Sequence, residues 1–181
     1  EYGDFSPNRI YCRDGQFYLV SMGGMRMVVT DESGAFVRAV DLAAAIGFTG
    51  QERMDSGLGG FSLDRDGGFV FTVPVMGKLF TLSNDGKTSR IFGRRGSRPG
   101  LFGVPTGVAV DRDGNYLVTD KLRCVVMVFD RKFSFLAEFA RRGFSQGDLI
   151  APDDIVVDAA NRVYVSNLRK RGVVVYQLSN Q

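Results

Sequence analysis

TGVAVDRDGNYLVTDKLRCVVMVFDRKFSFLAEFARRGFSQGDLIAP, from Thr106 to Pro152, reads as four short β-strands with a turn after each. The register of this stretch returns upstream and downstream, so the chain is a row of one supersecondary unit. The turn between its first two strands is Asp-Arg-Asp-Gly at 111–114, and the same residues stand at 64–67. Cys-Arg-Asp-Gly at 12–15 and Asp-Ala-Ala-Asn at 158–161 occupy the same place, because Gly and Asn both tolerate a left-handed turn.

The spacing of these turns decides the fold class. Gly15, Gly67, Gly114 and Asn161 are 52, 47 and 47 residues apart. A period of about 40 to 50 residues with four strands per unit is typical of propeller blades. Helical repeats of this length would show a 3.6-residue apolar period, which the sequence lacks. We therefore predict an all-β fold, a β-propeller of four-stranded antiparallel blades.

The best copy of the repeat runs from Pro105 to Gly143. It has the pattern P-x-G-V-A-V-D-x-x-G-x-x-x-V-x-D, then a basic residue, a run ending Val-Phe, and a Phe followed by an R-x-G loop. This pattern resembles the NHL repeat, and the resemblance covers essentially the whole chain, with the first blade the most divergent. Asp120 and Asn167 match the polar residue that closes the second strand in that family. The first two blades have Ser21 and Val73 there, so this match is partial.

The repeat divides the chain, 1–181, into blades of a single domain. Blade one covers about 5–41, a joining loop 42–57, blade two about 58–104, blade three about 105–151 and a partial blade four about 152–181, about three and three-quarter blades. The resemblance implies a six-bladed propeller, which needs roughly 280 residues. We therefore expect more chain or another subunit to complete the propeller, since an open arc exposes faces that normally pack on neighbours.

Three smaller features carry structural expectations. The joining loop contains LAAAIGF at 42–48, a helical turn that serves either as a packed plug or as a partner-docking insert. Cys12 and Cys124 fall two blades apart, beyond the reach of a disulfide, and we expect both to be small buried apolar residues. The third strand of blade four, Val173 to Tyr176, is expected to leave apolar side chains on an uncovered face.

The composition excludes several chemistries. The chain has no histidine, which removes a Ser-His-Asp triad, Cys-His catalysis and His-containing zinc sites. The resemblance implies enzymatic relatives among NHL propellers, the amidating lyases, which hold their metal with histidines. None of these histidine ligands can be carried over to this chain. The Asp-x-Asp-Gly turns are not calcium loops, because the twelfth position after Asp111 is Leu122 instead of Glu. We expect no cofactor.

Charge is sorted between the two sides of the predicted disc. The first-to-second and third-to-fourth strand turns share one side, which carries Asp14, Asp31, Glu32, Asp64, Asp66, Asp85, Asp111, Asp113 and Asp130. The second-to-third turns and the blade-joining loops share the other side. That side carries the candidate partner-binding residues Arg94, Arg95, Arg98, Lys121, Arg123, Arg141, Arg142, Arg169, Lys170 and Arg171. The net charge of +3 conceals this polarity.

These observations favour a non-enzymatic binding module that engages a partner on the basic loop face. A protein or another subunit is the expected partner, and an anionic polymer, RNA or an acidic glycan, is the alternative. Solvated loop surface explains the same charges without any partner. An RNA-binding propeller comes second, although Phe102 and Phe144 are the only aromatic residues near the arginines. A lyase-like or hydrolase-like enzyme, with its site in blades absent from this chain, comes third.

Overall fold

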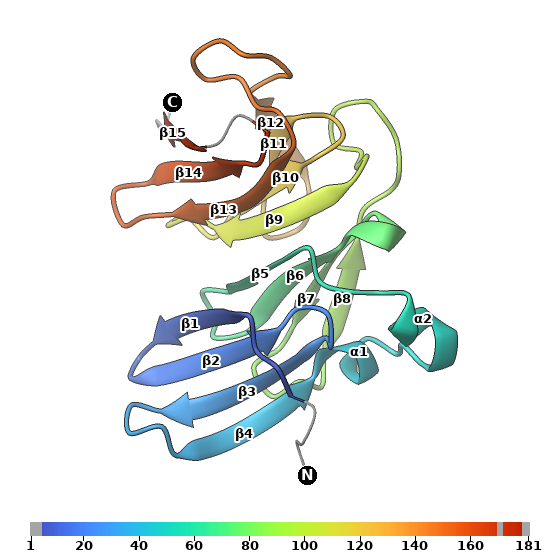
Figure 1. Ribbon diagram of the computed structural model, residues 1–181, viewed down its shortest axis with the longest axis vertical. Coiled ribbons are helices and arrows are strands. Elements are labelled where there is room, and N and C mark those ends of the chain that lie inside the picture. Colours follow the sequence, from blue (N-terminus) through green and yellow to red (C-terminus); the bar gives the residue numbers. More distant parts are fainter. Residues whose placement is uncertain (1–4, 170–171, 179–181) are drawn as a thin grey trace.

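The strands form four antiparallel sheets whose strands pair in sequence order (Figure 1). The computed structural model describes residues 5–169 and 172–178. Blade one contains β1 (Arg9–Arg13), β2 (Gln16–Ser21), β3 (Arg26–Asp31) and β4 (Phe36–Asp41). Blade two contains β5 (Gly60–Leu63), β6 (Phe69–Val73), β7 (Lys78–Leu82) and β8 (Ser89–Phe92). Blade three contains β9 (Pro105–Val110), β10 (Tyr116–Asp120), β11 (Val125–Phe129) and β12 (Phe135–Phe139). Blade four contains β13 (Pro152–Val157), β14 (Arg162–Asn167) and β15 (Gly172–Gln177).

The first strand of each blade lies toward the middle of the molecule, and the later strands lie progressively outward (Figure 1). Three sheets have four strands, and the fourth has three within the described residues. The chain is therefore an all-β propeller arc of four blades, as the repeat spacing predicts. Figure 1 also shows the hairpins β1–β2 and β3–β4 on one side of blade one, opposite the helices of the joining loop.

In four of the turns, the Asp that opens the turn accepts hydrogen bonds from the backbone of the same turn. Asp111 Oδ1 accepts the backbone N–H groups of Asp113 and Asn115, both at 2.8 Å. Gly114 then takes the left-handed conformation, at φ 84°, which a residue without Cβ adopts readily. The same pattern, with N–H groups two and four residues ahead, recurs at Asp31, Asp130 and Asp158. The motif is thus a turn device, in keeping with the preference of Asp for such turns.

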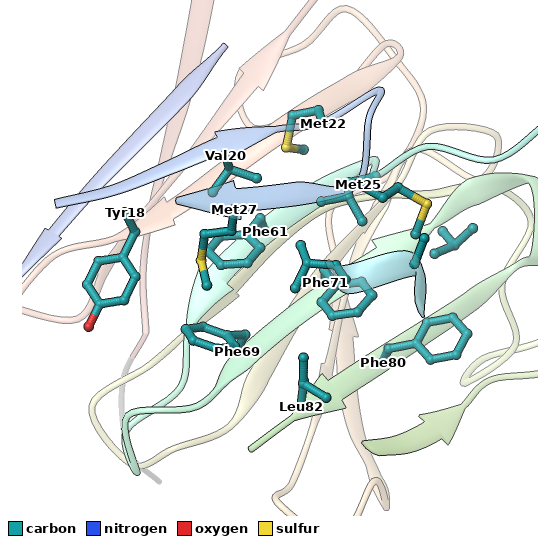
Figure 2. Packing of buried hydrophobic residues seen from close by; sticks show 14 of the residues in the cluster. Tyr18, Val20, Met22, Met25, Met27, Phe61, Phe69, Phe71, Phe80 and Leu82 are labelled. Atoms are coloured by element: carbon teal, nitrogen blue, oxygen red, sulfur yellow. The ribbon is translucent and has the colours of Figure 1, made fainter. Parts of the chain in front are cut away.

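Apolar side chains fill each interface between blades. Blade one packs Val20, Met25 and Met27 against Phe61 and Phe71 of blade two (Figure 2). A second cluster joins blades two and three, and a third joins blades three and four. β11 is buried along its whole length, because both of its faces are covered by neighbouring blades, as its unbroken apolar run predicts.

Short helices occupy the joining loop between blades one and two. α1 (Leu42–Ala45) begins at Asp41, whose Oδ1 accepts the Ala44 N–H at 3.0 Å, and it buries Leu42 fully against blade one. Phe48 is buried in the same cluster. These contacts support the packed alternative for this stretch. α2 (Gly50–Met54) follows and buries none of its residues; the sequence pattern did not predict it. A 3₁₀ turn, η1 (Pro74–Met76), joins β6 to β7.

The expectation for Cys12 is wrong, whereas that for Cys124 is confirmed. Cys124 is buried, but Cys12 is exposed on β1, and both are free thiols. Ile10, two residues away on the same strand, is exposed as well. Side chains two apart share one face of a strand, so this face of β1 is uncovered where the equivalent faces of inner strands within the arc are packed. The expected exposure on blade four is also present, at Val173 and Val175.

Neighbouring inner strands approach so closely that only glycine fits at one repeat position. A Cβ on Gly60 would lie 2.6 Å from Thr106 O and Val108 N. A Cβ on Gly107, one repeat later, would lie 2.8 Å from Asp154 Cα and Ile155 N. The obstacles are backbone atoms of the next blade, which cannot move aside as a flexible side chain can. The glycine at this position therefore permits the close spacing of blade two on blade three and of blade three on blade four.

Gly107→Ala should lower the free energy of unfolding by about 2 kcal/mol, because overpacking at a rigid interface typically costs about 1–3 kcal/mol. The matched control is Gly23→Ala, at an exposed turn where an added Cβ meets nothing within 4 Å. Urea unfolding followed by circular dichroism measures both. Equal stability of the two variants would contradict the close approach of β9 and β13.

Candidate functional site

The loops on the basic side of the arc are held by a buried carboxylate. Four backbone N–H groups donate to Asp120, which closes β10: those of Gly103 at 2.6 Å, Val104 at 3.1 Å, Leu122 at 3.1 Å and Arg123 at 2.9 Å. Asp120 is fully buried, and these donors replace the water it loses. It therefore joins the blade-joining loop to the β10–β11 turn.

Asn167 occupies the equivalent position in blade four and also bonds to the blade-joining loop. It closes β14 and accepts the Ile150 N–H at 2.8 Å through Oδ1. Its Nδ2 is buried without a partner among the described residues. A carboxylate offers two acceptor oxygens where an amide offers one, so blade four anchors its joining loop with fewer bonds than blade three.

The two arginine-bearing loops have the same backbone structure. In the loop after β8, the Phe102 N–H donates to Arg94 O at 2.9 Å; in the loop after β12, the Leu149 N–H donates to Arg141 O at 2.9 Å. Each loop opens with a left-handed residue, Gly93 or Ala140. Both thus project their arginine pairs from equivalent places on adjacent blades.

The second arginine of each pair anchors its loop. Arg95 donates through its guanidinium to Val75 O in the β6–β7 turn. Arg142 donates to Leu122 O in the β10–β11 turn, at 2.5 Å. Val75 and Leu122 are repeat equivalents, eight residues after their turn glycines. The same contact has therefore been kept in two blades, and it fixes a guanidinium beside each turn.

The remaining predicted residues differ in how far they are engaged. Arg123 Nη2 donates to both carboxylate oxygens of Glu138, at 2.8 and 3.0 Å, and the Arg123 side chain is mostly buried. A charge held in this way stabilises its own blade. Lys121 pairs with Asp153 of blade four at 3.6 Å. Arg141 pairs with Asp148 at 3.1 Å while its own side chain stays exposed.

Three predicted residues are exposed cations. Arg94, Arg98 and Arg169 make no ion pair within the described chain, and all three are exposed. Lys170 and Arg171 lie outside the described residues. The basic face thus combines anchored guanidinium groups with exposed ones.

Apolar side chains lie among these cations, which charge patterning alone did not predict. Val75 and Leu122, whose carbonyls hold the anchoring arginines, are each more than half exposed. Phe144, two residues after Arg142, is 81% exposed. Phe102, the other aromatic residue predicted near the arginines, is fully buried. The repeat register, which places residues 75 and 122 at the same turn tip, was the available signal for the first two.

The acidic side is mainly a set of turns. Hydrogen bonds to the carboxylate oxygens lower the pKa values of Asp31, Asp85 and Asp130. The backbone N–H of Arg162 is the main cause that lowers the pKa of Asp158 to about 2, and the Arg162 guanidinium and the Tyr164 hydroxyl add to it. The interpretation of these residues as turn formers therefore has a specific physical basis.

Within residues 5–169 and 172–178, no group of three or more Cys, Asp or Glu side chains has a geometry that could hold a metal ion. No helix in the same part of the chain is long and apolar enough to cross a membrane.

Four blades ordered around a common middle define the class of this chain as a β-propeller. No protein-family model and no curated protein matches its sequence. Solved structures do match in fold. A streptogramin B lyase is 14% identical with a TM-score of 0.64 over 95% of this chain and 54% of its own. Virginiamycin B lyase from Staphylococcus aureus is 13% identical with a TM-score of 0.62 over 99% of this chain and 58% of its own.

A third match is a catalytically inactive histidine-to-alanine variant of the Staphylococcus aureus lyase with quinupristin, at 13% identity and a TM-score of 0.57, over 93% of this chain and 54% of its own. This chain thus spans little more than half the length of the structures it matches. Likeness at this level of identity establishes the propeller fold. The NHL resemblance stays an expectation from the repeat pattern.

Asp120→Ala should lower the free energy of unfolding by about 3 kcal/mol. The change leaves buried N–H donors without an acceptor, and each unsatisfied donor costs about 1–3 kcal/mol. Asp120→Asn should recover part of the loss, since Asn167 fills the equivalent position. Asp113→Ala, an exposed turn residue, is the control and should change stability by less than about 0.5 kcal/mol. Thermal and urea unfolding measure all three, and an unperturbed Asp120→Ala variant would contradict the anchoring role.

Acid should weaken the β13–β14 turn in a defined range of pH. The folded pKa of Asp158, about 2, lies below the value of about 3.9 for an unfolded Asp. Its stabilisation is therefore complete above about pH 4 and is lost as the pH falls through about 2. Carboxyl NMR titration should give a midpoint near 2. The melting temperature of Asp158→Ala should fall less than that of the wild type over this range, and parallel curves would contradict the assignment.

Proposed function

We propose that this propeller is a binding module that engages an acidic protein surface through its basic loop face. The proposal rests mainly on one observation, a pair of equivalent turns on adjacent blades. In blade two the exposed Val75 adjoins the anchored Arg95, and in blade three the exposed Leu122 adjoins the anchored Arg142. An anchored guanidinium has already lost much of its conformational freedom, so it gives up less entropy when a partner binds.

The mixture of side chains favours a protein over a polyanion. Arginine and aromatic residues are enriched at protein interfaces, and Phe144, which is exposed, follows Arg141 and Arg142 in the same loop. Single-stranded RNA is held by several stacked bases on aromatic side chains, whereas Phe102 is buried and leaves Phe144 alone among the two aromatic candidates. Exposed Arg94 and Arg98 supply the charge that selects an acidic partner.

The matched lyases raise an enzymatic alternative. Their likeness to this chain supports a shared fold, and one of them is inactive once a histidine is replaced. This chain contains no histidine, so it cannot supply an equivalent group within the span that it covers. The binding hypothesis requires no group that the chain lacks, and for this reason we prefer it.

Immobilised peptides that alternate Asp or Glu with Leu or Phe provide the test. The wild-type chain should bind them. Leu122→Ser with Phe144→Ser should weaken binding about tenfold or more, since each side chain contributes burial of about 1.5–3 kcal/mol. Arg94→Glu with Arg98→Glu should weaken binding in a salt-dependent manner. Lys87→Glu with Lys132→Glu, an equal charge change at turns on the acidic side, is the control and should bind as the wild type does.

Peptides of Asp and Glu alone, oligouridine and heparin separate the alternatives. Binding of oligouridine that falls steeply with salt, together with wild-type behaviour of the apolar double variant, would replace the protein-binding hypothesis with RNA binding. No binding of any probe by the folded chain would leave the basic face as solvated surface and refute the proposal.

A further inference from the structure

The inner strands of all four blades contribute side chains to a cavity of about 350 Å³ that is open to solvent. In the ribbon, β1, β5, β9 and β13 follow one another around the middle of the arc (Figure 1). The volume of the cavity lies in the range of about 300–1,000 Å³ that is usual for small-molecule sites. Its wall is mostly aliphatic and aromatic, with Val108 of β9 and Phe61 of β5 among the lining residues.

Two large apolar side chains that line this cavity are exposed to solvent. Ile10 of β1 is 62% exposed and Val156 of β13 is 56% exposed, and both line the cavity. They come from the first and last blades. Exposed apolar side chains on both sides of one cavity form a surface that an apolar molecule of suitable size would cover.

The cavity also contains one opposed pair of charges. Arg9 Nε and Asp154 Oδ2 are 3.8 Å apart, and both side chains are partly exposed. Asp154 Oδ1 accepts the Ile155 N–H at 2.9 Å, which fixes the carboxylate. The neighbouring Asp153 pairs with Lys121, so Asp154 is the carboxylate that faces Arg9. A separation this long leaves both groups with unused hydrogen-bonding capacity.

Asp154 occupies the position at which blades two and three have glycine and blade one has Asn8. Counted from the turn residue of each blade, it is the equivalent of Gly60 and Gly107, the residues that meet the backbone of the next blade. The substitution places a carboxylate in the wall of the cavity.

Tyr11 adds a neutral polar group to the wall. Burial, followed by the Asp154 carboxylate, raises the pKa of Tyr11 to about 12, so its hydroxyl keeps its proton at neutral pH. Its ring packs on Phe61 with centroids 5.1 Å apart. The hydroxyl is thus held near Asp154 as a hydrogen-bonding group that adds no charge.

We propose that this cavity binds a small zwitterion with an apolar body, of the kind represented by a free apolar amino acid. The ligand carboxylate pairs with the Arg9 guanidinium, which suits planar carboxylates. The ligand ammonium pairs with Asp154, and the apolar body covers Ile10 and Val156. One long ion pair is thereby exchanged for two closer ones, whereas a ligand with a single charge would leave Arg9 or Asp154 without its counter-ion.

L-leucine is the probe, and calorimetry and NMR shifts of the cavity residues are the readouts. Leucine should bind in a 1:1 complex. N-acetyl-leucine, which lacks the ammonium, leucinamide, which lacks the carboxylate, and glycine, which lacks the apolar body, should each bind about tenfold more weakly or worse. Equal affinity of leucine and N-acetyl-leucine, or no leucine binding by the folded chain, would overturn the proposal.

Arg9→Gln and Asp154→Gly should each reduce leucine affinity about tenfold or more. Asp154→Gly introduces the residue found at this position in blades two and three, so we expect this variant to fold. It therefore still tests the proposal if the Arg9→Gln variant unfolds. The control is Arg26→Gln, which breaks a pair of similar length, 3.9 Å, and similar exposure with Asp41 on the outside of blade one. Equal loss in Arg26→Gln would refute the assignment to the cavity.

Discussion

The approach of neighbouring inner strands to backbone contact is the constraint on which the propeller depends. Gly60 and Gly107 permit it, and in blades two and four a hydroxyl near the end of the second strand bonds to the backbone at the same repeat position. Thr72 Oγ1 accepts the Gly60 N–H at 2.9 Å, and Ser166 Oγ accepts the Asp154 N–H at 2.8 Å. Because the inner strands are close together, the space between neighbouring blades widens outward. Large residues such as Phe71 and Phe129 fill this wider space.

The two sides of the arc use polar groups for different purposes. On the hairpin side Asp111 and Asp130 are used within their own turns. Asp64 and Asp66 of blade two instead bond to the Tyr116 hydroxyl and the Arg131 guanidinium of blade three. On the other side the polar groups join separate loops, as Asp120 and Arg142 do. What distinguishes the basic side as a candidate for recognition is the exposed apolar side chain, Val75 or Leu122, beside each anchored arginine.

Much of the fold followed from the sequence because the repeat is a local signal. The constant spacing of the turn residues and the four-strand pattern of residues 106–152 predicted blades of four antiparallel strands, and the structure has them in blades one to three. The site followed less well. Charge and register gave the arginines, but the roles of Arg95 and Arg142 depend on which carbonyl each guanidinium reaches, which no local pattern encodes. The prediction that Cys12 is buried was wrong for a similar reason, since the burial of β1 depends on neighbours across the arc. The pairing of Arg9 with Asp154 joins residues almost the whole chain apart.

The arginine anchor repeated in blades two and three has a consequence for how such a surface evolves. Each copy is built within one blade, because the guanidinium and the carbonyl it reaches belong to the same repeat. Duplication or loss of a blade would therefore change the number of contact points and leave the geometry of each intact. Valency is then set by gene-level repeat number, and avidity grows with the number of contact points that one partner can engage at once. Weak individual contacts suffice under such a scheme, and specificity lies in their spacing.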